Sequence, residues 1–169
     1  MNLAVIYDSK TGNTAQAAQW IAEGMNEIGG AQAQTFSIDA IDEDFVAAAK
    51  GIVIGSPTYA SLMTADLHRW LESTAKNLQM AGKLGGAFAT AQYTHGGGEQ
   101  VIQTILAREM VLGMLCYSGG SAMGKPVIHL GPVAIGSTAE PHNRLELYRE
   151  TCRIYGRRFA QKAVSLFGE

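Results

Sequence analysis

Six residues, separated from the first apolar stretch by Asp8 alone, have groups suited to binding a phosphate. The stretch 3–7 is apolar, and a helical pattern of apolar residues begins at Ala17, shortly after the six residues. A strand, a polar turn and a helix in this order direct free backbone N–H groups and the positive end of the helix dipole at an anion. The candidate residues are Ser9, Lys10, Thr11, Gly12, Asn13 and Thr14.

The composition of this loop favours a monophosphate over a nucleoside triphosphate. Lys10 is its only formal positive charge, so hydroxyl, amide and backbone donors would do most of the binding. Neither G-x-x-x-x-G-K-[ST] nor G-x-G-x-x-G occurs in the chain, which argues against a P-loop nucleotidase and a dedicated dinucleotide domain. Each residue alone is also a common helix-cap or turn residue, but six together favour phosphate binding.

Two more loops are predicted at the same edge of the fold, and each contains one tyrosine. In a parallel sheet, ligands bind at the carboxyl ends of the strands, where these loops lie. A flat heteroaromatic ring could lie against Tyr59 and Tyr93, although either tyrosine alone could equally be a loop residue with a hydrated hydroxyl. One phosphate and one flat ring indicate a mononucleotide, and flavin mononucleotide (FMN) is the best candidate. The loop residues expected to contact it are Ser56, Pro57, Thr58, Tyr59, Ala60, Thr90, Ala91, Gln92, Tyr93, His95, Gly96 and Gly97.

His95 is the one candidate catalytic residue. Its charge changes near neutral pH, so it could deliver protons beside the flavin, and a solvent-exposed loop histidine is an equally good interpretation. His68, His129 and His142 are scattered along the chain, so no metal site is expected. The sequence also offers no pairing of a nucleophile with a base.

Strands and helices are expected to alternate around these loops. Apolar runs predict strands at 3–7, 31–38, 52–54, 83–90 and 114–117, and the apolar segment 127–136 has no predicted geometry. Helical patterns follow the first strand and fall at 45–49, 64–77, 99–112 and 143–166, with a cap candidate at 141–143. The alternation predicts a parallel sheet covered by helices on both faces, in one α/β domain spanning residues 1–169.

Composition and charge argue against several classes of function. The 169 residues are 47% hydrophobic and 17% charged with a net charge of −2, which suits one compact domain without affinity for nucleic acid or a membrane surface. No apolar run reaches the roughly 20 residues of a spanning helix. The first three residues lack the basic segment of a secretory signal. Cys116 and Cys152 are isolated, as buried thiols in a reducing compartment would be, so a cytoplasmic location is expected.

The loops resemble those of a known family. Residues 9–14 match the flavodoxin phosphate-loop pattern T/S-x-T-G-N-T, and residues 55–59, 90–100 and 119–121 are similar to loops of the WrbA-type NAD(P)H:quinone oxidoreductases. The resemblance implies a flavodoxin-like three-layer sandwich with five parallel strands in the order 2-1-3-4-5. It also implies noncovalent FMN, reduced by NAD(P)H and reoxidised by a quinone, in homo-oligomers (dimers or tetramers) whose neighbouring chains complete the site.

The chain departs from the WrbA-type pattern at two places. Residues 59–61, Tyr-Ala-Ser, stand where the family has Arg-Phe-Gly, and residues 111–114, Val-Leu-Gly-Met, replace its His-His-Gly-Met. The chain is also shorter than typical members before and around residues 119–120. These differences leave the FMN expectation intact and weaken the expectation of quinone reduction. His95 could take the place of the missing histidine.

Two functions fit the expected flavin site. One is an FMN-dependent NAD(P)H oxidoreductase acting on quinones or similar acceptors, in which both substrates use one flavin face in turn. The other is a flavodoxin-type carrier, which shuttles electrons between redox proteins and usually presents an acidic face for docking. The predicted loops contain no acidic cluster, so the enzyme is favoured. A receiver-type signalling domain would need an acidic cluster, which Asp8 alone does not provide.

Overall fold

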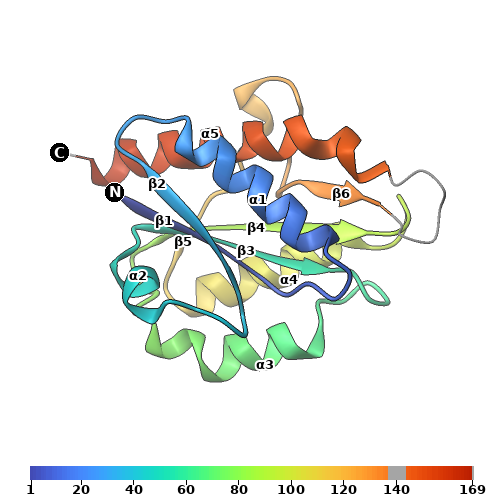
Figure 1. The fold of residues 1–169 in the computed structure, drawn as a ribbon, viewed down its shortest axis with the longest axis horizontal. Coiled ribbons are helices and arrows are strands. Elements are labelled where there is room, and N and C mark those ends of the chain that lie inside the picture. Colours follow the sequence, from blue (N-terminus) through green and yellow to red (C-terminus); the bar gives the residue numbers. More distant parts are fainter. Residues whose placement is uncertain (137–143, 169) are drawn as a thin grey trace.

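Strands and helices alternate along the chain, as the apolar runs predict. A computed structural model describes residues 1–136 and 144–168 (Figure 1). The strands are β1 (Asn2–Tyr7), β2 (Gln32–Ser37), β3 (Gly51–Pro57), β4 (Leu84–Ala91), β5 (Leu115–Cys116) and β6 (Val133–Ile135). The helices are α1 (Asn13–Asn26), α2 (Glu43–Ala48), α3 (Ala65–Ser73), α4 (Gly98–Val111) and α5 (Arg149–Phe167).

The sheet is parallel and has the order β2-β1-β3-β4-β5, so the predicted order is confirmed. It differs from the expected five strands because its last position is divided. β5 pairs with Leu84 and Gly85 at the start of β4, whereas β6 pairs with residues 89–91 at the end of β4. The chain between them leaves the sheet and returns, so the end of the apolar segment 127–136 becomes a sixth strand.

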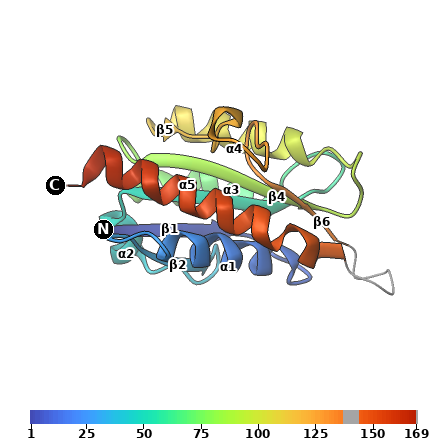
Figure 2. The same ribbon diagram turned by 90° about the horizontal axis from the view of Figure 1, so that it is seen from above.

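Side chains alternate along the strands and form an apolar core on each face of the sheet. In β1, Leu3 and Val5 belong to the core under α1 and α5, while Ala4 and Ile6 belong to the opposite core. Figures 1 and 2 show α1 and α5 side by side on one face, with α3 and α4 on the other. The expected arrangement of helices on both faces is therefore confirmed.

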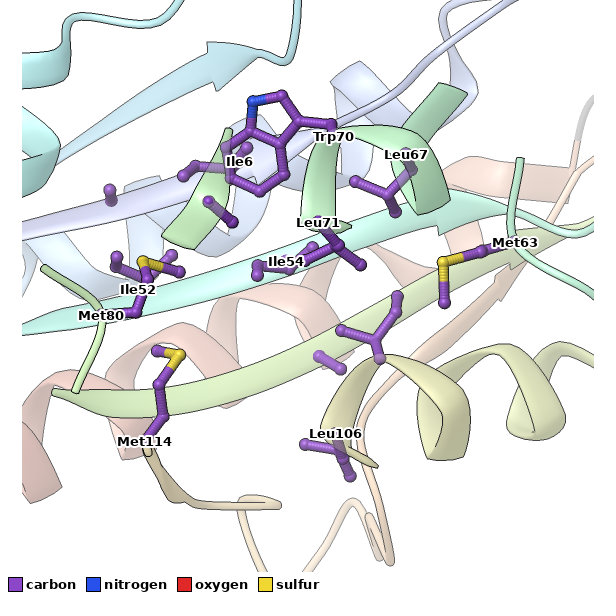
Figure 3. Close-up of a cluster of buried hydrophobic side chains, with 14 of the residues drawn as sticks. Ile6, Ile52, Ile54, Met63, Leu67, Trp70, Leu71, Met80, Leu106 and Met114 are labelled. Atoms are coloured by element: carbon purple, nitrogen blue, oxygen red, sulfur yellow. The ribbon is translucent and has the colours of Figure 1, made fainter. Parts of the chain in front are cut away.

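The core beneath α3 is built from long aliphatic and aromatic side chains. Figure 3 shows Trp70 and Leu71 of α3 lying over Ile6, Ile52 and Ile54 of the sheet. Ile52, Ile54 and Leu71 are fully buried. Because most residues of β1 and β3 are buried, the loops that follow these two strands stand on a rigid support.

Glycines allow α1 and α5 to pack closely. A Cβ atom at Gly156 would overlap the backbone oxygen of Ile21, and one at Gly24 would overlap the backbone oxygen of Arg153. Each helix therefore presents a bare backbone to the other. This contact fixes α1, whose first two residues, Asn13 and Thr14, are the last two of the predicted phosphate loop.

Two predicted helices are shorter than expected. The helix predicted at 64–77 ends at Ser73 and is followed by a 3₁₀ turn at Ala75–Asn77, as is common where helix propensity falls near a terminus. The last α-helix begins at Arg149 after a 3₁₀ turn at Arg144–Tyr148, and the cap candidate 141–143 lies outside the described residues. Among the described helices, none combines the length and hydropathy needed to cross a membrane.

Candidate functional site

The carboxyl ends of β1, β3, β4 and β6 lie side by side at one edge of the sheet, on the right of Figure 1. Strand register places Pro57 beside Thr90, and Ala91 beside Ile135. The loops after β1, β3 and β4, together with Gly136 after β6, enclose a hollow that we call the central pocket. It is lined by Thr11, Asn13, Pro57, Thr58, Tyr59, Thr90, Ala91, Gln92 and Gly136. All of these except Gly136 are residues that the sequence predicts for the FMN site.

The phosphate loop is tied to the rest of the sheet edge by its own polar side chains. The buried Thr14 places Oγ1 2.9 Å from Oγ1 of Thr90, and Asn13 Nδ2 donates to the Gly136 carbonyl over 3.3 Å. Ser9 Oγ accepts from the backbone N–H of Ala15 at 3.2 Å. Gly12 precedes α1 with a φ of 92°, a left-handed conformation that favours glycine. The loop therefore has a defined shape around the start of α1.

Lys10 does not line the central pocket. Its Nζ donates to Asp66 Oδ2 at 2.8 Å and lies 3.3 Å from Asp8 Oδ1. The hydrogen bonds to Asp66 and Asp8 raise the pKa of the lysine. The only formal charge of the loop is thus engaged with carboxylates, which leaves neutral donors to hold an anion in the pocket.

The second loop turns sharply beside the pocket. Tyr59 and Leu62 exchange two backbone hydrogen bonds of 2.9 Å, and the residues between them, Ala60 and Ser61, have φ values of 49° and 66°. Such positive φ values in residues other than glycine are concentrated at functional sites. Tyr59 lines the pocket and is 51% exposed, so its ring is available to a ligand, whereas Ala60 does not line it.

Ser56 holds the second loop without lining the central pocket. It is fully buried, donates to the Pro57 carbonyl at 2.8 Å and accepts from the backbone N–H of Thr64 at 3.1 Å. Ser56 therefore connects the end of β3 to the start of α3. Thr58, by contrast, lines the pocket, and its buried Oγ1 has no hydrogen-bond partner among the described residues.

Tyr93 and His95 lie in a neighbouring hollow, which we call the adjoining pocket. It shares Gln92 and Gly136 with the central pocket. Its lining consists of Gln92, Tyr93, Thr94, His95, Ile135, Gly136 and Arg144. The structure therefore separates the two predicted tyrosines, with Tyr59 in the central pocket and Tyr93 in the adjoining one.

Gly96 and Gly97 shape the third loop and do not line either pocket. The Gly96 N–H donates to the Tyr93 carbonyl at 3.0 Å, which closes a turn. Gly97 has a φ of 88° and packs so closely on Ser61 that a Cβ atom would overlap the serine side chain. The second and third loops thus support each other.

The segment 119–121 is placed away from both pockets. It follows β5, which pairs with the first residues of β4, whereas the pockets lie at the last residues of β4. The guanidinium of Arg158 holds this part of the chain by donating to five backbone carbonyls, those of Gly119, Met123, Gly124, Lys125 and Pro126. Its similarity to a WrbA-type loop therefore does not place it at the candidate site.

Four lining residues were not predicted from the sequence: Thr94, Ile135, Gly136 and Arg144. Thr94 lies in the predicted third loop between two predicted residues. The other three belong to β6 or follow it along the chain, and the three residues of β6 are too few for a periodic pattern. The sequence shows that the segment 127–136 is apolar, but it does not show that the end of this segment pairs with β4.

The residues at this edge fit FMN. The first turn of α1 and the hydroxyl and amide groups of Thr11 and Asn13 offer neutral donors to a phosphate. The unpartnered hydroxyl of Thr58 and the exposed ring of Tyr59 suit the polar edge and the face of a flat ring. The described residues contain no group of three or more ligands that could hold a metal.

Comparisons with known proteins agree with this geometry. The model of the family described as NADPH-dependent FMN reductase matches residues 1–128. The chain belongs to this family. A flavodoxin from Clostridium saccharobutylicum is 38% identical to the present chain over 167 residues. The alignment covers 99% of the chain and 100% of the relative.

Two other similarities concern proteins of the WrbA and quinone-dehydrogenase kind. An NAD(P)H dehydrogenase (quinone) from Geobacter sulfurreducens is 28% identical over 210 aligned residues, covering 99% of the chain and 100% of the relative. The crystal structure of a WrbA-like flavodoxin from Agrobacterium tumefaciens has a TM-score of 0.76 at 23% identity, covering 97% and 98% of the two chains. The flavodoxin-like fold and the predicted resemblance are confirmed.

Proposed function

We propose that this FMN reductase family member is a flavoprotein that takes electrons from NAD(P)H and passes them to a quinone or similar small acceptor. The observation that carries the proposal is the central pocket, where three predicted loops meet at the start of α1 and offer neutral phosphate donors beside an exposed tyrosine. FMN, held noncovalently, would supply the redox chemistry.

The residues of the central pocket would bind and orient the flavin. The loop 9–14 and the first turn of α1 would hold the phosphate, while Thr58 and Gln92 would bond polar atoms of the ring. Tyr59 would cover part of the ring and exclude water. The two left-handed residues that follow it fix the direction of the tyrosine.

His95 is proposed as the residue that holds a proton for transfer near the flavin. It lies in the adjoining pocket, which shares Gln92 and Gly136 with the central one, so a substrate reaching the flavin from that side would pass it. Both substrates would use this open side in turn, because no second nucleotide domain is present in the fold of the described residues.

A flavodoxin-type electron carrier is the second candidate. It is favoured by the flavodoxin of Clostridium saccharobutylicum, which matches this chain over its full length without a large difference in size. The Geobacter sulfurreducens protein aligns over 210 positions against 169 residues here, so it contains segments that this chain lacks. Against a carrier, the described lining of the two pockets includes no carboxylate that could form an acidic docking face.

We further propose a homo-oligomer, a dimer or tetramer, in the cytoplasm. The segment 110–127, which contains β5, has five exposed apolar side chains that a second copy would cover: Met110, Val111, Leu115, Met123 and Val127. Both cysteines are unpaired thiols, which suits a reducing compartment, although Cys116 is exposed and only Cys152 is buried as expected. Sedimentation velocity of the purified protein tests the oligomer.

Steady-state turnover separates the enzyme from the carrier. Protein saturated with FMN should oxidise NADPH or NADH many times per flavin when a soluble quinone is added, and protein without FMN should not. A flavin-loaded protein that shows no quinone-dependent oxidation of either nucleotide would favour the carrier.

A further inference from the structure

The turn that follows Tyr59 has a backbone conformation that its two central residues disfavour. Backbone hydrogen bonds of 2.9 Å join Tyr59 and Leu62 in both directions. Ala60 and Ser61, which lie between them, have φ values of 49° and 66°. Two-residue turns of this kind favour glycine and asparagine, because in other residues the Cβ atom comes too close to the following carbonyl oxygen. Contacts outside the turn must therefore hold it in place.

The side chain of Ser61 makes such a contact with the third loop. Its Oγ donates to the carbonyl of Gly96 over 3.4 Å. The serine also packs against Gly97, where a Cβ atom would overlap both Oγ and Cβ of the serine. Gly97 directly precedes α4, which is fixed to the sheet by the fully buried Val101 and Ile102. Ser61 therefore rests on a rigid part of the fold.

This contact joins the two loops that carry the predicted flavin residues. On one side, Tyr59 stands two positions before Ser61, lines the central pocket and has an exposed ring. On the other side, Gly96 accepts from Ser61 and donates its own N–H to the Tyr93 carbonyl at 3.0 Å. That second bond closes the turn that contains His95. Ser61 is therefore placed to fix the second loop relative to the third.

We infer that Ser61 is a positioning residue, which holds the ring of Tyr59 against bound FMN by anchoring the second loop to the third. Ser61 lines neither pocket, so it would act through Tyr59 and not on the flavin itself. A glycine at this position would adopt the left-handed conformation more readily, but it would make neither contact. The inference rests on the proposed function for the placement of Tyr59 over the flavin.

Ser61→Gly tests the role of the side chain, since it keeps the left-handed backbone accessible and removes the contacts with Gly96 and Gly97. FMN should leave this variant about 3- to 10-fold faster than wild type, because a hydrogen bond and its supporting contacts are lost. Flavin fluorescence after rapid dilution measures the release rate. The circular dichroism of bound flavin in its visible absorption bands should also weaken, because Tyr59 no longer has a fixed position. Ser61→Ala, which loses only the hydroxyl, should change both quantities in the same direction and by less.

Gln79→Gly is the matched control. Gln79 is exposed, has a φ of 51° and lies outside both pockets, in the segment before β4. Glycine there relieves the same backbone conformation without touching the site, so FMN release and the visible circular dichroism should match wild type. Far-UV circular dichroism reports intact folding in every variant.

A double-mutant cycle with Tyr59→Ala tests whether Ser61 acts through the tyrosine. If it does, Ser61→Gly should not accelerate FMN release further once the ring of Tyr59 is gone. An acceleration of the same size in the Tyr59→Ala background would overturn the inference. Release of FMN from Ser61→Gly at the rate of Gln79→Gly would overturn it as well.

These measurements are independent of electron transfer. If neither NADPH nor NADH reduces the flavin while Ser61→Gly releases FMN faster only in the presence of Tyr59, the proposed electron transfer fails and the positioning role of Ser61 stands. If the flavin is reduced and turned over while Ser61→Gly keeps the wild-type release rate, the inference alone is overturned.

Discussion

At the scale of single residues, the candidate site depends on neutral donors whose positions are fixed by other contacts. Thr14 reaches Thr90 across the sheet edge, and Asn13 reaches Gly136. Lys10, the residue that the sequence marks as the charge of the loop, is instead held by Asp66 and Asp8. Asp66 lies 56 positions further along the chain, and no local pattern connects it to Lys10, so this ion pair could not be predicted.

The double variant Asn13→Ala with Thr14→Ala tests the phosphate loop. It removes an amide and a hydroxyl beside the start of α1, and the loss of two such contacts should weaken FMN binding by at least about 10-fold while the fold persists. Fluorescence titration with FMN measures the affinity, and circular dichroism reports the fold. Thr104→Ala, which removes the hydroxyl of a half-buried threonine in α4 outside both pockets, is the control. Wild-type affinity in a folded double variant would contradict the assignment.

The buried carboxyl group of Glu109 should make the unfolding free energy depend on pH. It is completely buried in α4, its Oε1 has no partner among the described residues, and burial raises its pKa well above the usual value of 4.5. The folded protein therefore keeps a proton that the unfolded chain loses, and stability should decrease as pH rises above about 4.5. Glu109→Gln removes this titration. Between pH 5 and pH 8, wild type should therefore lose about 1–3 kcal/mol more unfolding free energy than Glu109→Gln does.

Urea unfolding at the two pH values measures this difference. Glu99→Gln is a matched control, because Glu99 is an exposed carboxylate near the start of the same helix. If the unfolding free energy changes equally in wild type and in Glu109→Gln between pH 5 and pH 8, the carboxyl group of Glu109 is not held protonated.

At the scale of elements, α1 is positioned by its contact with α5, and α1 carries the phosphate loop at its start. Gly156→Ala would place a methyl group against the Ile21 carbonyl, and the helices would have to separate. We expect a loss of about 1–3 kcal/mol in unfolding free energy, in spite of the higher helix propensity of alanine. Chemical denaturation measures it, with Gly29→Ala, where a Cβ atom meets open space, as the control. A Gly156→Ala protein as stable as wild type would refute this close packing.

The elements also show what the sequence could predict. The buried runs of β1, β3 and β4 are long enough to be recognised, and the loops after them follow from the strand ends, so most of the central pocket was predictable. β6 has three residues, and its place beside residues 89–91 depends on a pairing across more than 40 positions, for which the sequence has no local signal. Gly136 and Arg144 were missed for that reason. The place of Tyr93 in the adjoining pocket, separate from Tyr59, could not be predicted either, and its contact with the flavin stays a prediction.

At the scale of the whole molecule, the sheet separates two regions with different properties. The carboxyl edge carries both pockets, while the segment 110–127 has exposed apolar side chains and contains β5, which pairs with the opposite end of β4. In the proposed function, an electron donor and an acceptor would meet the flavin at the carboxyl edge, and a second copy of the chain would cover the other region.

The central claim is that this edge binds FMN and that the bound flavin accepts electrons from NAD(P)H. The most direct test is anaerobic addition of NADPH or NADH to the FMN-loaded protein, followed by absorbance at about 450 nm, where oxidised flavin absorbs. We predict rapid and complete bleaching, reversed when a quinone is added. Bound flavin that keeps its absorbance with both nucleotides, yet bleaches with dithionite, would contradict the claim.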